Sequence, residues 1–258
     1  MALSENGGAT VAKIRHIAFI VKEPQKLYDF YHHIFDVEDV RRSDTGAIHV
    51  IDGFFNLAFL QQVQTESEVA STHRADGAEV NQRQGINHYG FTVDKLDDVL
   101  SRLDDSIKFG ESPQNGRPAE LRVIDPWGNN FDLSSRGFLG REEKKLPGVR
   151  HMVVQVDRPD KAAEFYTSAL GLEELRRDAD GSIVLGDGDI TMGLVDEPFI
   201  GRPGIQYFGL QVEDWSAAQK RFKDVGSDLP DLRAGQTEAR MRDPEGNLFV
   251  VSEQGWGA

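Results

Sequence analysis

Two polar side chains stand in stretches that otherwise predict buried β-strands. His88 lies in GINHYGFTV, residues 85–93, where strand alternation puts Tyr89 and Phe91 on one face and the imidazole on the other. Asp132 follows the turn DPWGNN further along the chain, at a strand position that an apolar side chain would fill at lower cost. A histidine and a carboxylate delivered by two strands indicate a metal-binding cup.

The elements that carry these residues belong to an internal repeat. IRHIAFIV matches VRHMVVQV, which pairs His16 with His151, and the register continues without a gap through GAIHVIDGFFNLAFL against GSIVLGDGDITMGLV. After a long polar insert in the first copy, residues 61–84, GINHYGFTV matches GIQYFGLQV and DPWGNNFDLSS matches DPEGNLFVVSE. The chain is therefore one domain duplicated.

Each copy predicts the same order of elements, namely strand, helix, two or three strands, connector, strand, helix and strands. The first helix is expected from about Glu23 to Phe35, because its apolar residues are spaced to form one stripe. The fold class is therefore α+β, built from four βαβββ modules. The predicted division is a flexible N-terminal tail at 1–13, a first domain at 14–136, a linker at 137–147 and a second domain at 148–258.

Composition excludes several kinds of partner and site. The net charge is −14, which repels phosphate backbones and anionic lipid headgroups, so neither nucleic acid nor a membrane surface is expected as a partner. No apolar run is long enough for a bilayer span, and the first residues do not resemble a secretion signal, so we expect a soluble, cytoplasmic protein. The absence of cysteine excludes disulfides, thiolate ligands and a cysteine nucleophile.

The duplicated pattern, with RHIAF, NHYGF and DPWGN, resembles the vicinal oxygen chelate superfamily of glyoxalases, extradiol dioxygenases and bleomycin-resistance proteins. This resemblance covers nearly the whole chain. It implies two tandem glyoxalase/dioxygenase-like domains, in which curled mixed sheets form a cup that binds a divalent metal. Carried over position by position, the ligands are His16, His88 and Asp132, with Asp where the family more often has Glu. Tyr207 and Val250 replace the last two in the second copy, so one metal site is expected.

The pairing of the modules leaves one ligand open. Pairing within a domain gives His16, whereas crosswise pairing would bring His151 to His88 and Asp132 instead. We expect His16, because the path within one domain is shorter; either histidine could equally be a hydrogen-bonded strand residue beside the cup. Two neutral imidazoles and a carboxylate leave open coordination positions, which suits Fe(II) and other divalent ions. The sequence does not distinguish Fe, Mn, Ni, Co and Zn.

Two further residues are candidate catalytic groups. Arg122 stands where the family's ring-cleaving dioxygenases carry a tyrosine, and it could pair with a substrate carboxylate through two hydrogen bonds. The alternative is an exposed strand arginine. His49, where the other copy has Val184, could transfer a proton near neutral pH.

Three functions stay open. The first, which we favour, is a metal-dependent lyase or isomerase of the glyoxalase type acting on a small molecule chelated through adjacent oxygens. The second is an Fe(II) extradiol dioxygenase, disfavoured by Arg122. The third is a non-catalytic protein that binds a small molecule and confers resistance to it. A homodimer is left open.

Overall fold

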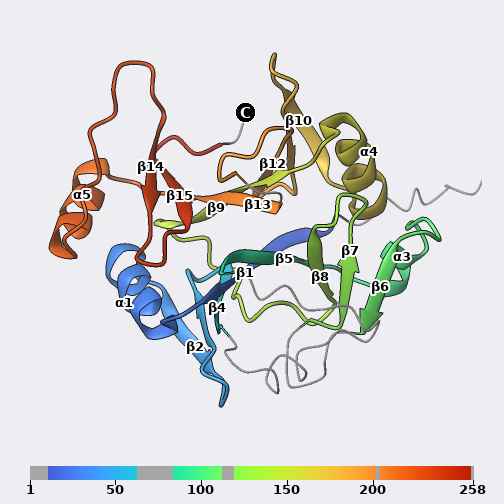
Figure 1. The fold of residues 1–258 in the computed structure, drawn as a ribbon, viewed down its shortest axis with the longest axis horizontal. Helices are drawn as coiled ribbons and strands as arrows, with labels where there is room; N and C mark the ends of the chain where they lie inside the picture. Colours follow the sequence, from blue (N-terminus) through green and yellow to red (C-terminus); the bar gives the residue numbers. More distant parts are fainter. Residues whose placement is uncertain (1–10, 63–83, 112–118, 202–203, 257–258) are drawn as a thin grey trace, which may run out of the picture.

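The computed structural model describes residues 11–62, 84–111, 119–201 and 204–256, so most of the predicted N-terminal tail and of the polar insert lie outside the described residues (Figure 1). The protein is α+β, with two tandem halves of the same design. The first half contains β1 (Lys13–Val21), α1 (Pro24–Phe35), β2 (Glu38–Arg42), β3 (Ile48–Ile51), β4 (Asn56–Gln61), β5 (Gly85–Thr92), α3 (Leu96–Leu100), β6 (Lys108–Glu111), β7 (Leu121–Ile124) and β8 (Asn130–Ser134). The second half contains β9 (Gly148–Gln155), α4 (Pro159–Leu170), β10 (Glu173–Arg177), β11 (Ile183–Gly186), β12 (Thr191–Val195), β13 (Gly204–Gln211), α5 (Trp215–Asp224), β14 (Glu238–Arg242) and β15 (Leu248–Ser252).

Each half forms one mixed, open sheet. The strand order is β2-β3-β4-β1-β5-β8-β7-β6 in the first half and β10-β11-β12-β9-β13-β15-β14 in the second. At the centre of each sheet, the first strands of the two modules pair antiparallel, β1 with β5 and β9 with β13. The modules therefore pair within a half, and the three strands β1, β5 and β8 lie side by side.

The helices cover the faces of the sheets that point into the shared core. In α1, the predicted stripe is buried, and the helix starts with Pro24, whose ring suits the first turn, and ends at Asp36 in the left-handed conformation. The alternation in β5 is also confirmed, because Tyr89 and Phe91 are buried in the core. His88 consequently lies on the opposite face of the same strand.

The two sheets are held together by reciprocal contacts. Figure 1 shows α1 beside β14 and β15 of the other half, and α4 beside β7 and β8. Tyr31 of α1 donates to Asp243 in the turn before β15 at 2.9 Å, and Tyr166 of α4 donates to Asp125 in the turn before β8 at 2.6 Å. One hydrophobic cluster runs through both halves. The duplicated domains are therefore packed as one body.

Two hairpin turns that begin with Asp-Gly, one in each half, also connect the halves. Asp52 accepts a hydrogen bond from the backbone N–H of Val149 in β9 at 2.7 Å, while Asp187 accepts one from Ile14 in β1 at 2.6 Å. Both carboxylates are buried, and Asp187 also accepts from the Arg15 guanidinium at 3.0 Å. Each half thus holds the first strand of the other half through a buried carboxylate.

No helix in the described parts of the chain is long and apolar enough to cross a membrane.

Candidate metal centre

The register of the first sheet places the polar residues in two rows on the face turned away from the core. Residues directly opposite each other on neighbouring strands point to the same side of a sheet. One row across β4, β1, β5, β8 and β7 contains Asn56, His16, Gly90, Asp132 and Arg122. The next row, across β3, β4, β1 and β5, contains His49, Ala58, Ala18 and His88. The small residues between the polar ones leave room for the imidazoles and the carboxylate to converge.

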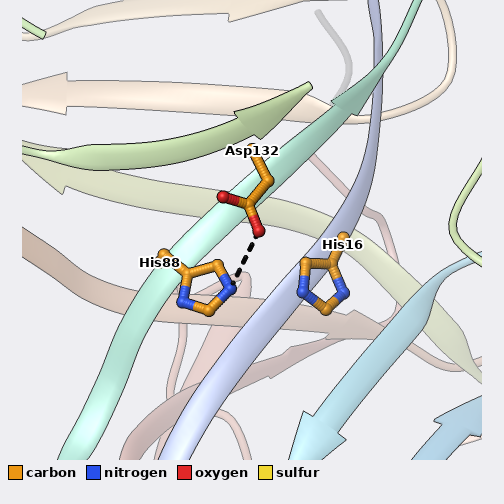
Figure 2. A group of neighbouring side chains, drawn as sticks. All are labelled: His16, His88 and Asp132. Atoms are coloured by element: carbon orange, nitrogen blue, oxygen red, sulfur yellow. Dashed lines mark ion pairs between the residues drawn. The ribbon is translucent and has the colours of Figure 1, made fainter. Parts of the chain in front are cut away.

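His16, His88 and Asp132 converge on one point, as Figure 2 shows. One potential ligand atom from each of them lies within 4.8 Å of the others, and all three residues are buried. His88 Nε2 lies 3.3 Å from Asp132 Oδ2, and the two imidazole rings are 5.4 Å apart between centroids. Two imidazole nitrogens and a carboxylate oxygen at this spacing form a donor set for a divalent ion.

Asn56 fixes the tautomer of His16. His16 Nδ1 lies 2.7 Å from Asn56 Oδ1, and the Asn56 amide group donates to the carbonyl of Val50 at 2.9 Å, which turns its oxygen toward the histidine. Nδ1 therefore carries the proton, and Nε2 keeps the lone pair that a metal needs. Burial, together with the neighbouring His88, lowers the pKa of His16 well below its ordinary value, so the ring stays neutral.

His88 has the same arrangement with a different partner. Its Nδ1 lies 2.9 Å from Asn87 Oδ1, so Nε2 is the nitrogen that faces Asp132. A lone pair on Nε2 directed at a carboxylate is an arrangement that a cation or proton between the two groups stabilises. The donor set therefore fits a divalent ion in both chemistry and orientation.

Asp132 is also paired with Arg122. The guanidinium donates from Nε to Oδ1 at 2.6 Å and from Nη2 to Oδ2 at 2.9 Å, across the β7–β8 hairpin. Although burial opposes it, the charge of Arg122 and the hydrogen bonds that it donates hold the pKa of Asp132 below its ordinary value. The carboxylate is therefore ionised and able to bind a cation, and Arg122 is not an exposed strand residue.

An aromatic ring completes the surroundings of His16. Phe138, in the segment after β8, stacks on the imidazole with 4.8 Å between centroids and an angle of 4° between the planes. This is possible because residue 90 is glycine, where a Cβ would lie 2.6 Å from Phe138 Cζ. The stack excludes water from one side of the ring and fixes its plane.

The second half keeps the frame but only one of the three donors, because Tyr207 and Val250 stand where the first half has His88 and Asp132. His151 is placed like His16, because its Nδ1 lies 2.7 Å from Thr191 Oγ1 and its ring stacks on Trp256 at 5.0 Å. The surrounding positions are apolar, however, and form a separate cluster of Val153, Tyr207, Leu248 and Val250. Burial and the nearby Arg176 lower the pKa of His151 to about 3. His151 lies in the other sheet and is not part of the group around Asp132.

The structure adds residues that the sequence reasoning did not single out. These are Asn56, Asn87 and Phe138, which contact the two imidazoles. The predicted His49 lies one row away from His16 and interacts with it electrostatically. Two of the missed residues carry a signal in the repeat, since Asn56 matches Thr191 and Phe138 matches Trp256. A polar or aromatic residue at equivalent positions in both copies indicates a shared structural role, which here is contact with the histidine of the first strand.

Comparisons with known proteins agree with this architecture. No curated protein matches the chain. Among solved structures, the 2,3-dioxygenase LapB from Pseudomonas sp. KL28 superposes with a TM-score of 0.71 at 15% identity, covering 98% of this chain and 95% of that one. The Mn(II)-bound glyoxalase from Novosphingobium aromaticivorans gives a TM-score of 0.72 at 15% identity, covering 96% and 84%. Homoprotocatechuate 2,3-dioxygenase from Brevibacterium fuscum, in complex with 3,4-dihydroxyphenylacetate, gives 0.64 at 13% identity, covering 96% and 83%.

These likenesses show the fold, and a family model defines the group. The model of the glyoxalase/bleomycin resistance protein/dioxygenase superfamily matches residues 13–133 and again residues 148–251, one match for each half. The glyoxalase structure contains Mn(II), and the homoprotocatechuate dioxygenase structure contains the small-molecule substrate 3,4-dihydroxyphenylacetate. The chain belongs to the glyoxalase/bleomycin resistance protein/dioxygenase superfamily.

Proposed function

We propose that the protein is a divalent-metal-dependent enzyme of the glyoxalase-like lyase or isomerase type, acting on a small oxygenated molecule through two adjacent oxygens. The observation that carries this proposal is the convergence of two imidazole nitrogens and one carboxylate within 4.8 Å in the first half. The ligands are His16, His88 and Asp132, and the ion is Fe, Mn, Ni, Co or Zn. When bound, the ion would act as a Lewis acid that withdraws negative charge from the substrate oxygens.

The remaining polar residues have roles that follow from their positions. Asn56 and Asn87 keep the proton on Nδ1 of the two histidines, which leaves each Nε2 directed toward the centre. Phe138 keeps bulk water from one side of the His16 ring and so strengthens the electrostatic interactions there. His49 holds or accepts a proton one row from His16.

Arg122 is proposed to orient a substrate that carries a carboxylate. Its planar fork already holds a carboxylate through two hydrogen bonds, which is the geometry that it would offer to a substrate acid. To do so, Arg122 must give up at least one of its two hydrogen bonds to Asp132 and donate to the substrate carboxylate instead. We therefore expect an acidic substrate to be preferred over a neutral analogue.

A second candidate is an extradiol dioxygenase. A site of two histidines and one carboxylate is the set that non-haem Fe(II) enzymes use, and this observation favours it. Arg122 occupies the strand next to Asp132 where an acid-base group for oxygen chemistry is expected, and an arginine does not exchange protons at neutral pH. We therefore rank this function second. A sequestering protein without turnover remains the third.

A metal assay tests the proposal. The protein is stripped with a chelator, and binding of Mn²⁺, Fe²⁺, Co²⁺, Ni²⁺ and Zn²⁺ is measured by calorimetry. We expect one ion per chain, lost in His88→Ala and Asp132→Asn and retained in the matched control His151→Ala. Absence of binding by the wild-type protein would refute a metalloenzyme and favour the sequestering function.

Turnover then separates the two enzyme classes. Iron binding with an absorbance change on adding catechols in air would place the dioxygenase first. Activity with Mn²⁺, Co²⁺, Ni²⁺ or Zn²⁺ on small hydroxyketones or hydroxy acids, without oxygen uptake, supports the lyase or isomerase.

A further inference from the structure

Arg122 and a divalent ion have the same partner in this site. The guanidinium contacts both oxygens of Asp132, and His88 Nε2 lies 3.3 Å from one of them. The side chains of Arg122 and Asp132 are only 13% and 4% exposed, so this pair is shielded from solvent. The one negative charge among the three donors is therefore already balanced by a cation of the protein itself.

From this geometry we infer that Arg122 is a resident counter-cation that competes with the divalent ion for Asp132 and thereby sets the metal affinity of the site. The inference rests on the proposed function, because it requires that His16, His88 and Asp132 bind the ion. It adds a determinant that the donor set alone does not contain.

Electrostatics give the direction of the effect. A divalent ion at Asp132 stands next to a guanidinium on the adjacent strand, and two cations that share a buried carboxylate repel each other more strongly than they would in water. Arg122 can also turn away, but it then loses two charge-assisted hydrogen bonds. Either response weakens metal binding relative to the same site without the positive charge.

Without metal, the same contact keeps the site intact. A buried carboxylate without a cation is costly, and Arg122 removes that cost by holding both oxygens of Asp132. The arginine thus stabilises the metal-free protein more than the metal-bound protein. The difference between these two stabilisation energies is its effect on metal affinity.

The chain contains an internal control for this effect. Arg240 occupies the position of Arg122 in the second half, opposite Val250 on β15 where the first half has Asp132. Its guanidinium lies 4.9 Å from the centre of the Phe199 ring. Replacing Arg240 removes the same charge at an equivalent strand position in the other sheet.

The test compares Mn²⁺ affinity in four proteins, measured by calorimetry and by the electron paramagnetic resonance signal of free Mn²⁺. Arg122→Gln keeps a hydrogen-bond donor and loses the charge, and we expect it to bind Mn²⁺ at least about tenfold more tightly than the wild type, or about 1.4 kcal/mol. Arg122→Lys keeps the charge and should stay within about threefold of the wild type. Arg240→Gln should not change the affinity.

Each outcome decides between the inference and the proposed function. Equal or weaker Mn²⁺ binding by Arg122→Gln, with binding by the wild type, overturns the inference alone. An equal gain in Arg122→Lys also overturns it, because the charge would then not be the cause. Binding by Arg122→Gln without binding by the wild type supports the competition by Arg122 but overturns the proposed function of the wild-type protein, and binding by neither overturns both. If Arg122→Gln does not fold, Arg122→Met is the second uncharged variant, judged by the same criteria.

Discussion

Gly90 is predicted to be essential for the orientation of His16. In Gly90→Ala, the new Cβ would lie 2.6 Å from Phe138 Cζ, 3.0 Å from its Cε1 and 3.1 Å from His16 Cβ. Carbon atoms in contact are normally about 3.5–4.0 Å apart, so the overlap with the ring is about an ångström. Overpacking of this kind costs about 1–3 kcal/mol of stability. The easiest relief is movement of Phe138, which would release the plane of the His16 ring.

The expected result is a loss of both stability and metal binding. Supporting contacts around a metal ligand are worth about 10- to 100-fold in affinity, so Mn²⁺ binding by Gly90→Ala should weaken by that factor, measured by calorimetry. Unfolding in urea, followed by circular dichroism, should give the stability loss. Gly209→Ala is the matched control, because its Cβ would lie 2.6 Å from Trp256 and 2.8 Å from His151 Cβ. It should be destabilised similarly and bind Mn²⁺ normally.

The double variant Gly90→Ala with Phe138→Leu separates the clash from other effects. If the ring is the obstacle, the stability losses of the two single substitutions should not add, because the smaller side chain removes the overlap. Additive losses, or an unchanged Mn²⁺ affinity in Gly90→Ala, would refute the role of the Phe138 stack in positioning His16.

Three further predictions follow from contacts in the two halves. Asn56→Ala should lower Mn²⁺ affinity about 10- to 100-fold, whereas Thr191→Val, its counterpart beside His151, should leave the affinity unchanged, as calorimetry can show. The buried His151 has a pKa of about 3 in the folded protein, against an ordinary 6.5. Between these two pH values the unfolded chain binds a proton that the folded chain does not, so the free energy of unfolding falls as the pH falls below 6.5. Urea titrations at pH 7 and pH 5 should show that the free energy of unfolding falls by about 2 kcal/mol less in His151→Gln than in the wild type between these two pH values. Asp187→Ala should cost about 3–5 kcal/mol in the same assay, because it leaves the buried N–H groups of Ile14 and Ile190 without their acceptor and removes one of the two carboxylates that bind Arg15. A cost below about 1 kcal/mol would contradict that role.

The sequence was sufficient for the architecture because several signals agreed. The repeat, the helical stripe of α1 and the alternation in β5 all pointed to the same duplicated fold, and each is present in the structure. Strand alternation also placed His88 on the face opposite Tyr89 and Phe91. Local patterns of this kind depend on the chain nearby and can therefore be read without coordinates.

The partners of the site residues could be predicted only in part. Arg122 and Asp132 are equally far from Trp127 in the turn, so a hairpin centred there would have placed them opposite each other. The stack of Phe138 on His16 was less accessible, because it depends on how the segment after β8 folds back over β5. The choice between His16 and His151 depended on strand pairing between modules, which is a contact between distant segments and leaves no local pattern.

The second half, which lacks two of the three donors, still contributes to the environment of His16. Asp187, in the second half, binds the backbone of Ile14 two residues before His16, and Asp189 beside it binds the Arg15 guanidinium at 2.8 Å. The second half thus supports the strand that presents the imidazole. We therefore expect substitutions in the apolar cluster around His151 to affect metal binding less than substitutions at Asp187 or Asp189.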